Sequence, residues 1–262
     1  MEAPRDVSRR RISVQGRAFD VVSCAIADNY DDVSAMLSYT ANLPIRQDAI
    51  ICDVGANIGI YSLSYASLYP QARIYAFEPH PDTYDLLMRS VQLNGALAER
   101  VHPFNVGLSE AKGRARLSVP VPTQHPRYDP QRNQINCGLF SLHGHGTQRV
   151  SCQVTTLDEF VAGHRLPHVE FMKIDVEGHE YEVLKGGERT IRTYRPVLYL
   201  EYNELTKALS RYHEDAFEMF FRRHRYRVYG VQYGWARDLK PLPTLAETAN
   251  VSDLLCVPEE GA

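Results

Sequence analysis

A turn rich in glycine joins an apolar segment to a helical segment early in the chain. It reads Asp53-Val54-Gly55-Ala56-Asn57-Ile58-Gly59. Glycine lets the backbone turn tightly, and the helix N-terminus that follows offers free N–H groups and the positive end of the helix dipole. The dinucleotide fingerprint needs glycine at positions 55, 57 and 60, where this chain has Gly55, Asn57 and Ile60. Side chains at two of those positions would crowd a pyrophosphate, so the turn favours a carboxylate over NAD or FAD.

An acidic residue follows this turn at a distance that suits a ribose. Glu78 ends the next apolar segment, nineteen residues after Gly59. A carboxylate at that place can accept hydrogen bonds from both hydroxyls of a ribose. The alternative is that Glu78 only complements the dipole of the helix that begins near Asp82.

A third group of ionisable residues lies at the end of a later apolar segment, in Lys173-Ile174-Asp175-Val176-Glu177-Gly178-His179-Glu180. Open α/β sheets bind ligands at the carboxyl ends of their strands, so these groups are predicted to face a crevice. Glu201, at the end of the next strand, is expected at the same edge as a substrate-binding residue. One alternative is helix capping by Asp175 or Glu177. The alternative for Glu201 is a salt bridge with Lys173 or Arg195 at the rim of the crevice.

A fourth motif is Asn136-Cys137-Gly138-Leu139-Phe140-Ser141. Asn136 and Ser141 could hydrogen-bond a polar substrate. A simple β-turn around Asn136–Gly138 explains the same residues equally well.

The elements that must position these residues alternate between strand and helix, which predicts βαβ units and a parallel sheet. Residues 1–48 are predicted to form an N-terminal extension packed on the main domain, and residues 49–262 the main domain, with an insertion at 113–154 after the third strand. The predicted strands are Ala49–Val54, Arg73–Phe77, Val101–Val106, Val169–Ile174 and Val197–Glu201, with a closing hairpin of Tyr226–Tyr229 and Leu254–Val257. The predicted helices are Ile58–Leu68, Asp82–Leu93, Leu157–Ala162, Glu180–Arg192 and Glu214–His224, with a short one near Asp31–Tyr39.

Composition excludes several function classes. The chain has 262 residues, a formal net charge of -3 and 44% hydrophobic residues, as one globular domain would. The acidic balance argues against nucleic acid as a partner, and no stretch reaches the ~20 apolar residues of a membrane span. The five cysteines are widely spaced, which favours a reduced, cytoplasmic location. The Arg9–Arg11 run lacks the apolar region of an export signal and is expected to be a solvated basic tail.

Several of these segments together resemble the FkbM-type methyltransferase family. They are "ICDVGANIGIYSLSYA", "IYAFEPHPDTYDLL", "VTTLDEFV", "FMKIDVEGHEYEVLKGGERTI" and "RPVLYLEYNE". The resemblance covers roughly residues 49–204, and its specificity lies in the order and spacing of the blocks. Pro120–Gln134 and residues 205–262 match nothing in the family pattern, which leaves the substrate unidentified.

The resemblance implies a Rossmann-like class I fold, with a mostly parallel seven-stranded sheet and helices on both faces, that uses S-adenosylmethionine. It implies methyl transfer to a hydroxyl of a small-molecule or glycan acceptor: a sugar, a glycolipid or a polyketide-type product. The cofactor-binding residues it implies are Asp53, Gly55, Asn57, Gly59 and Glu78, with Asn105 and Gly107 at the adenine edge.

For the chemistry, Asp175 is the first candidate for the base that takes the hydroxyl proton, and His179 is the second. Glu177 would hold a second substrate hydroxyl. A divalent ion on Asp175, Glu177 and Glu201 is compatible with hard oxygen ligands but is not expected. The alternatives are an NAD-type oxidoreductase and a non-catalytic S-adenosylmethionine-binding module. The oligomeric state does not follow from the sequence.

Overall fold

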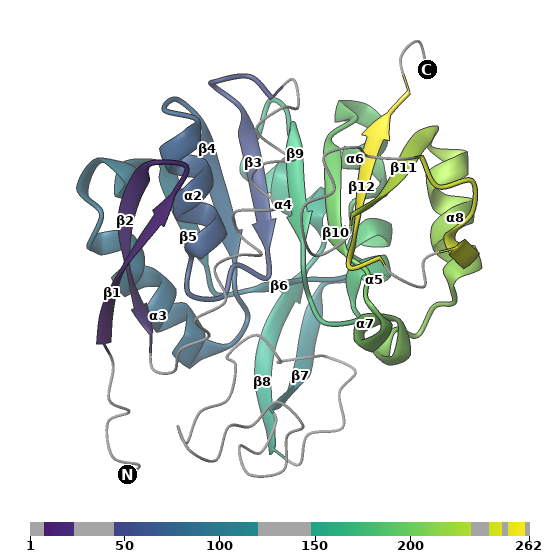
Figure 1. The fold of residues 1–262 in the computed structure, drawn as a ribbon. Coiled ribbons are helices and arrows are strands. Elements are labelled where there is room, and N and C mark those ends of the chain that lie inside the picture. The colour runs from purple at the N-terminus through teal and green to yellow at the C-terminus, as the bar shows by residue number, and fades with distance from the viewer. Residues whose placement is uncertain (1–7, 24–44, 120–147, 232–240, 248–250, 260–262) are drawn as a thin grey trace.

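The computed structural model describes residues 8–23, 45–119, 148–231, 241–247 and 251–259 of the chain (Figure 1). Within these residues, a seven-stranded sheet has the order β11-β12-β10-β9-β3-β4-β5. Its strands are β3 (Ile50–Val54), β4 (Arg73–Phe77), β5 (Val101–Phe104), β9 (Phe171–Ile174), β10 (Val197–Glu201), β11 (Tyr226–Val231) and β12 (Asp253–Pro258).

The sheet is parallel except at β12, which runs antiparallel to both of its neighbours, β10 and β11. The mostly parallel seven-stranded sheet and its closing antiparallel hairpin are therefore confirmed. The central strands β3 and β9 read as apolar runs because helices cover both faces of the sheet.

The two faces of the sheet carry separate apolar cores. Helices α2 (Ile60–Leu68) and α3 (Pro81–Gln92) cover one face; α4 (Leu157–Gly163), α5 (Glu180–Gly186), α6 (Glu188–Tyr194) and α8 (Glu214–Arg223) cover the other. Side chains alternate between the faces along a strand. Asp53, Lys173 and Tyr199, which are partners in the register of β3, β9 and β10, therefore share the α2 face.

A smaller sheet of order β6-β8-β7 extends below the carboxyl ends of the central strands (Figure 1). It consists of β6 (Gly107–Leu108), β7 (Gly113–Val119) and β8 (Gln148–Thr155). The two long strands are the described parts of the predicted insertion. Residues 120–147, which include Asn136 and Ser141, lie outside the described residues, as does the helix predicted near Asp31–Tyr39.

The N-terminal segment forms an antiparallel hairpin of β1 (Ser8–Val14) and β2 (Arg17–Ser23). Its apolar side chains join the core that α2 and α3 share with the sheet. Arg9–Arg11 is not the expected tail, although the side chains of Arg9 and Arg11 are solvent-exposed as expected. These residues are part of β1, and Asp20 on β2 binds the guanidinium of Arg9 at 2.7 Å, because a paired strand places opposite charges side by side.

Two helical predictions need correction. The single helix predicted for Glu180–Arg192 is two helices, broken at Gly187. The side chain of Asp158, on α4, accepts hydrogen bonds from the backbone N–H groups of Arg189 and Thr190 and so caps the second helix. A further helix, α7 (Glu204–Leu209), begins with an Asn203 capping box that the sequence analysis did not recognise. No helix in the described ranges has the length and apolarity needed to cross a bilayer.

Gly55 brings the carboxyl ends of β3 and β9 into backbone contact. Its φ is +81°, and a Cβ there would lie 1.9 Å from the carbonyl oxygen of Asp175. Gly55 was expected to form a tight turn and to bind the cofactor; the structure shows that it also allows close approach by the segment after the neighbouring strand β9. Gly59, with φ +92°, is similarly limited by the Leu87 side chain at 2.7 Å.

We expect Gly55→Ala to destabilise the fold. The left-handed backbone alone costs about 1–2 kcal/mol for a residue with a Cβ, and the clash with backbone adds to it. Gly163→Ala is the matched control, because nothing lies within 4 Å of its added Cβ and its φ is ordinary. Thermal unfolding should show a lower midpoint for Gly55→Ala and an unchanged midpoint for Gly163→Ala. Equal midpoints would show that the backbone around Gly55 and Asp175 can move apart to accept a Cβ.

Candidate active site

Glu78 holds the glycine turn against the start of α3. Its Oε2 accepts a hydrogen bond from the backbone N–H of Asn57 at 3.0 Å, and its Oε1 accepts one from that of His80 at 2.9 Å. The side chain is 6% exposed, and burial raises its pKa to about 7. Since each carboxylate oxygen has a second lone pair, Glu78 can accept further hydrogen bonds from a ligand.

Asn57 shows why this turn tolerates a residue other than glycine. Its φ is +51°, in the left-handed region that asparagine enters more readily than most residues. The Oδ1 of Asn57 is buried and has no hydrogen-bond partner among the described residues. Buried polar atoms are normally satisfied, so this oxygen fits a ligand seated at the turn.

Asp53 lies beneath the turn and is fully buried. Its Oδ2 accepts a hydrogen bond from the Ser62 hydroxyl at 2.5 Å, and its Oδ1 lies 3.6 Å from Lys173 Nζ. Burial raises its pKa, against the opposing effect of Lys173. Asp53 therefore supports the turn from below, with its contacts to Ser62 and Lys173.

The predicted adenine edge lies beside Glu78. Asn105 is exposed and donates from Nδ2 to the carbonyl of Glu78 at 2.9 Å. A Cβ on Gly107 would lie 3.3 Å from Val154 and 3.4 Å from Pro79, so this glycine keeps β6 close to both. Both residues thus adjoin the turn of Glu78.

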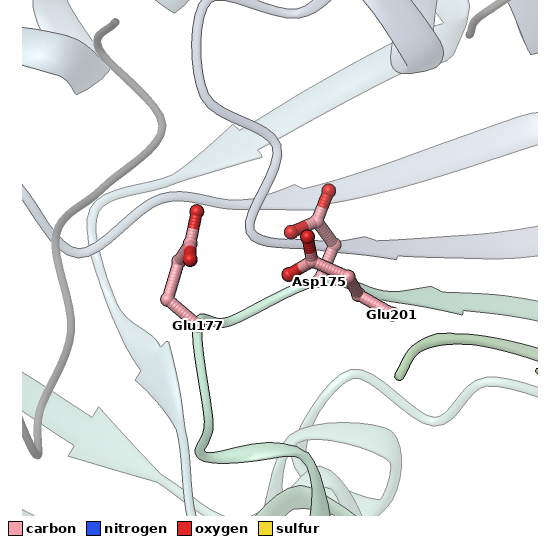
Figure 2. A group of neighbouring side chains, drawn as sticks. All are labelled: Asp175, Glu177 and Glu201. Atoms are coloured by element: carbon pink, nitrogen blue, oxygen red, sulfur yellow. The ribbon is translucent and has the colours of Figure 1, made fainter. Parts of the chain in front are cut away.

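Three carboxylates meet at the ends of β9 and β10 (Figure 2). Ligand atoms of Asp175, Glu177 and Glu201 all lie within 4.8 Å of one another. The Asp175 side chain is 34% exposed, so solutes can reach it. Glu201 is more enclosed: its Oε1 binds Asn203 Nδ2 at 2.8 Å, while its Oε2 has no hydrogen-bond partner among the described residues. Burial, and then the charge of Asp175, raises its pKa well above the usual range.

The capping alternative for Asp175 and Glu177 is wrong. The N-cap of α5 is His179, and its side chain makes no capping hydrogen bond. The loop is held instead by Glu180, whose Oε1 accepts hydrogen bonds from the N–H groups of Val176 and Gly178, both at 3.1 Å. Glu177 itself adopts a left-handed φ of +55°, a conformation that is retained only where the surroundings impose it.

His179 is not a member of the group of three carboxylates. Its Nε2 lies 3.0 Å from the Ser109 hydroxyl, and its Nδ1 lies 3.5 Å from Glu182. Both ring nitrogens thus contact residues of α5 and the segment after β6. The structure brings together Asp175, Glu177 and Glu201, and it leaves His179 outside that group.

Lys173 is a site residue that was expected only as a salt-bridge partner of Glu201, whereas its ion pairs are with Asp53 and Asp175. It is 2% exposed, its Nζ lies 3.1 Å from Asp175 Oδ2, and it lies 4.5 Å from the centre of the Tyr61 ring. Burial alone would lower the pKa of this ammonium, but Asp175 and Asp53 outweigh it and raise the pKa. The signal was a lysine within a strand otherwise made of Phe171, Met172 and Ile174, since buried lysine is rare unless paired.

Asp253 was also missed. It is the register partner of Glu201 at the start of β12, and it accepts a hydrogen bond from Ser252 Oγ at 2.8 Å. Burial raises its pKa to about 7. The strand containing it is antiparallel, so its first residue lies beside the last residue of β10.

These buried acids predict how stability depends on pH. Burial raises the pKa of Glu78 to about 7, of Glu180 to about 8 and of Asp253 to about 7. The folded state therefore keeps protons that the unfolded state releases near pH 4, so the free energy of unfolding falls as the pH rises through this range. Between about pH 5 and 8 we expect the thermal midpoint to decrease.

Glu180→Gln should make the decrease of the thermal midpoint with pH less steep, because the amide of glutamine cannot lose a proton. Thermal unfolding of both proteins across the same buffers measures it. A midpoint that rises from pH 5 to 8, or an identical slope in the variant, would contradict the assignment.

Comparison with known proteins identifies the family of the chain. The model of the methyltransferase FkbM domain matches residues 53–228. The chain is 34% identical over 164 residues to methyltransferase sdnD of Sordaria araneosa, covering 56% of this chain and 62% of that protein. It is 29% identical over 176 residues to hexuronic acid methyltransferase AglP of Haloferax volcanii, covering 63% of each. The chain thus spans less than two thirds of the length of these relatives.

The fold is also shared with a solved structure, that of methyltransferase FkbM from Methylobacillus flagellatus. The TM-score is 0.53 at 16% identity, over 89% of this chain and 56% of that one. The likeness supports the Rossmann-like class I architecture predicted from the sequence. With the family model matching from the glycine turn to β11, the chain belongs to the FkbM methyltransferase domain family.

Proposed function

We propose that this chain transfers the methyl group of S-adenosylmethionine to a hydroxyl oxygen of a small-molecule or glycan acceptor. The observation that carries the proposal is the meeting of Asp175, Glu177 and Glu201 beside the Glu78-held turn. Both lie at the carboxyl ends of adjacent parallel strands, where sheets of this kind bind ligands. One edge of the sheet thus offers a cofactor position and a proton acceptor next to each other.

The start of α2 suits the carboxylate of the methionine part. Its N-cap, Gly59, provides no side-chain cap, and its first turn contains no acidic residue. The N–H groups and the positive dipole end are therefore not neutralised by the protein's own acids. Glu78 would then accept the ribose hydroxyls, and Asn105 would lie near the adenine.

When bound, the cofactor supplies an electrophilic methyl group on a sulfonium. The acceptor oxygen would form its bond to that carbon as the C–S bond breaks, and the electron pair of the C–S bond would stay on sulfur. The hydroxyl proton must leave as the new C–O bond forms, and Asp175 is the reachable base. Glu177 and Glu201 hold neighbouring hydroxyls of the acceptor. His179 is the weaker candidate because both of its ring nitrogens are engaged elsewhere.

Oxygen is the acceptor atom that the relatives favour. A hexuronic acid, the substrate named for the similar AglP protein, contains no heteroatom other than oxygen. We place the acceptor on the side of β7 and β8, the described strands of the 113–154 insertion, because they extend beyond the edge where the carboxylates meet (Figure 1). Sugar, glycolipid and polyketide alcohols are the acceptors to test.

Glu78→Ala tests the cofactor position. Removing the acceptor of two ribose hydroxyls from a buried site costs about 1–3 kcal/mol, which is roughly a ten- to hundred-fold loss of affinity for S-adenosylmethionine. Titration calorimetry measures this affinity. The titration is done below the unfolding temperature of the variant, because Glu78→Ala also removes the acceptor of two backbone hydrogen bonds at the turn. A change under twofold would leave Glu78 with only its structural hydrogen bonds.

Asp175→Asn tests the base. The substitution keeps size and removes the charge, so release of S-adenosylhomocysteine should fall by ~10²–10⁴-fold. Affinity for S-adenosylmethionine should change little, since its proposed contacts come from β3 and β4. Asp85→Asn, on the exposed face of α3, is the control for the same chemical change.

The assay first needs an acceptor, found by screening sugar and polyketide alcohols for S-adenosylhomocysteine release. Full turnover in Asp175→Asn would exclude this carboxylate as the base. Absence of calorimetric binding of S-adenosylmethionine to the unmodified protein would contradict the proposed function itself.

A further inference from the structure

Lys173 lies between the two halves of the proposed site. Its Nζ is 3.6 Å from Asp53, which lies under the cofactor turn, and 3.1 Å from Asp175, the proposed base. The Tyr61 ring, on the first turn of α2, lies 4.5 Å from the same nitrogen. One ammonium thus contacts an acid from each half and an aromatic face.

The surroundings require this charge. Asp53 is fully buried, and Lys173 is 2% exposed on a strand whose other side chains are apolar. A buried carboxylate is retained only with a partner, because water cannot solvate it. Asp53 has a single hydroxyl as hydrogen-bond partner among the described residues, so Lys173 is its main source of positive charge there.

The three carboxylates above Lys173 raise the question of a divalent ion. Their oxygens lie within 4.8 Å of one another and are the hard ligands that such ions prefer. One oxygen of Asp175, however, already lies 3.1 Å from the buried ammonium of Lys173. A divalent ion on Asp175 would meet the repulsion of that charge in a poorly solvated place.

We propose that Lys173 is the resident cation of this acid cluster, and that it positions Asp175 relative to the cofactor turn without a divalent ion. Lys173 does not touch the reacting atoms and acts through Asp175. The role of Lys173 in positioning Asp175 as the base rests on the proposed function, whereas its role in balancing the charge of the acids does not.

Mn²⁺ alone is the probe for charge balance, and its binding is followed by electron paramagnetic resonance of the free ion. The unmodified protein and the control Lys185→Met, which alters a lysine on α5 that pairs with Glu110, should show no saturable binding tighter than about 1 mM, the weak end of protein cation sites. Lys173→Met should create a saturable site, because it leaves the carboxylates uncompensated. Lys173→Met/Asp175→Asn should lose that site, and Lys173→Arg should never acquire it.

Lys173→Met can fail to fold, since it leaves Asp53 buried without its cation. Lys173→Met/Asp53→Asn then carries the same Mn²⁺ test, because it removes both members of that pair while Asp175, Glu177 and Glu201 remain. We also expect this double variant to unfold at a higher temperature than Lys173→Met. A double variant less stable than Lys173→Met would overturn the pairing.

Saturable Mn²⁺ binding to the unmodified protein that Asp175→Asn abolishes would overturn the proposal, and so would a folded Lys173→Met that binds no Mn²⁺. Calorimetry with S-adenosylmethionine is run on the same samples. If the cofactor fails to bind the unmodified protein, the proposed function fails while the Mn²⁺ result still decides the role of Lys173. If it binds, S-adenosylhomocysteine release should be insensitive to EDTA and should be retained better by Lys173→Arg than by Lys173→Met.

Discussion

The absence of a side chain at Gly55 fixes the relation between the two halves of the site. The backbone of this residue lies against the carbonyl of Asp175, while the N–H of Asp175 donates to Val54 at 3.0 Å. The turn after β3 and the loop after β9 are therefore joined through main chain, which is far less deformable than side-chain contacts. Groups on both segments keep their relative positions before any ligand arrives, which is the form of preorganisation that catalysis by alignment requires.

Around this contact, strand alternation gathers polar groups on one face of the sheet. Asp53, Lys173 and Tyr199 are register neighbours on three adjacent strands. Glu201 and Asp253 pair with each other on the same face, two residues nearer the carboxyl end of β10. Buried charges are costly unless they are paired. These groups meet this requirement: the ammonium of Lys173 lies beside Asp53, and burial raises the pKa of Asp53, Glu201 and Asp253.

The sequence predicted the architecture well because its strongest signals are periodic. Apolar runs located the strands and most helices, and βα alternation predicted a parallel sheet. The helix break at Gly187 could not be predicted this way, because it depends on tertiary contacts. A Cβ on Gly186 would lie 1.9 Å from the Ser109 carbonyl, and one on Gly187 would lie 2.8 Å from Leu157.

The sequence predicted the site residues that follow apolar strands but not those that lie within them. Asp175, Glu177 and Glu201 follow apolar strands, so the edge of the sheet where they meet could be expected. Lys173 and Asp253 lie within or at the start of strands, and their importance depends on which face they occupy and which neighbours they meet. The base candidate His179 shows the converse. It is close to Asp175 in sequence, but its ring turns toward Ser109.

The N-terminal hairpin has a consequence for how the folded chain behaves in concentrated solution. The backbone N–H groups of Asp20 and Val22 do not point into open solvent. The N–H of Val22 donates to the hydroxyl of Ser90 on α3, and the N–H of Asp20 donates to Oδ1 of Asn94, just after α3, each at 2.9 Å. An open strand edge with free N–H groups is a template for adding another chain and a common route to aggregation. Here one polar side chain of α3 and one from a residue just after that helix bind these N–H groups, so the hairpin can add a β layer to the domain without offering them to a neighbouring molecule.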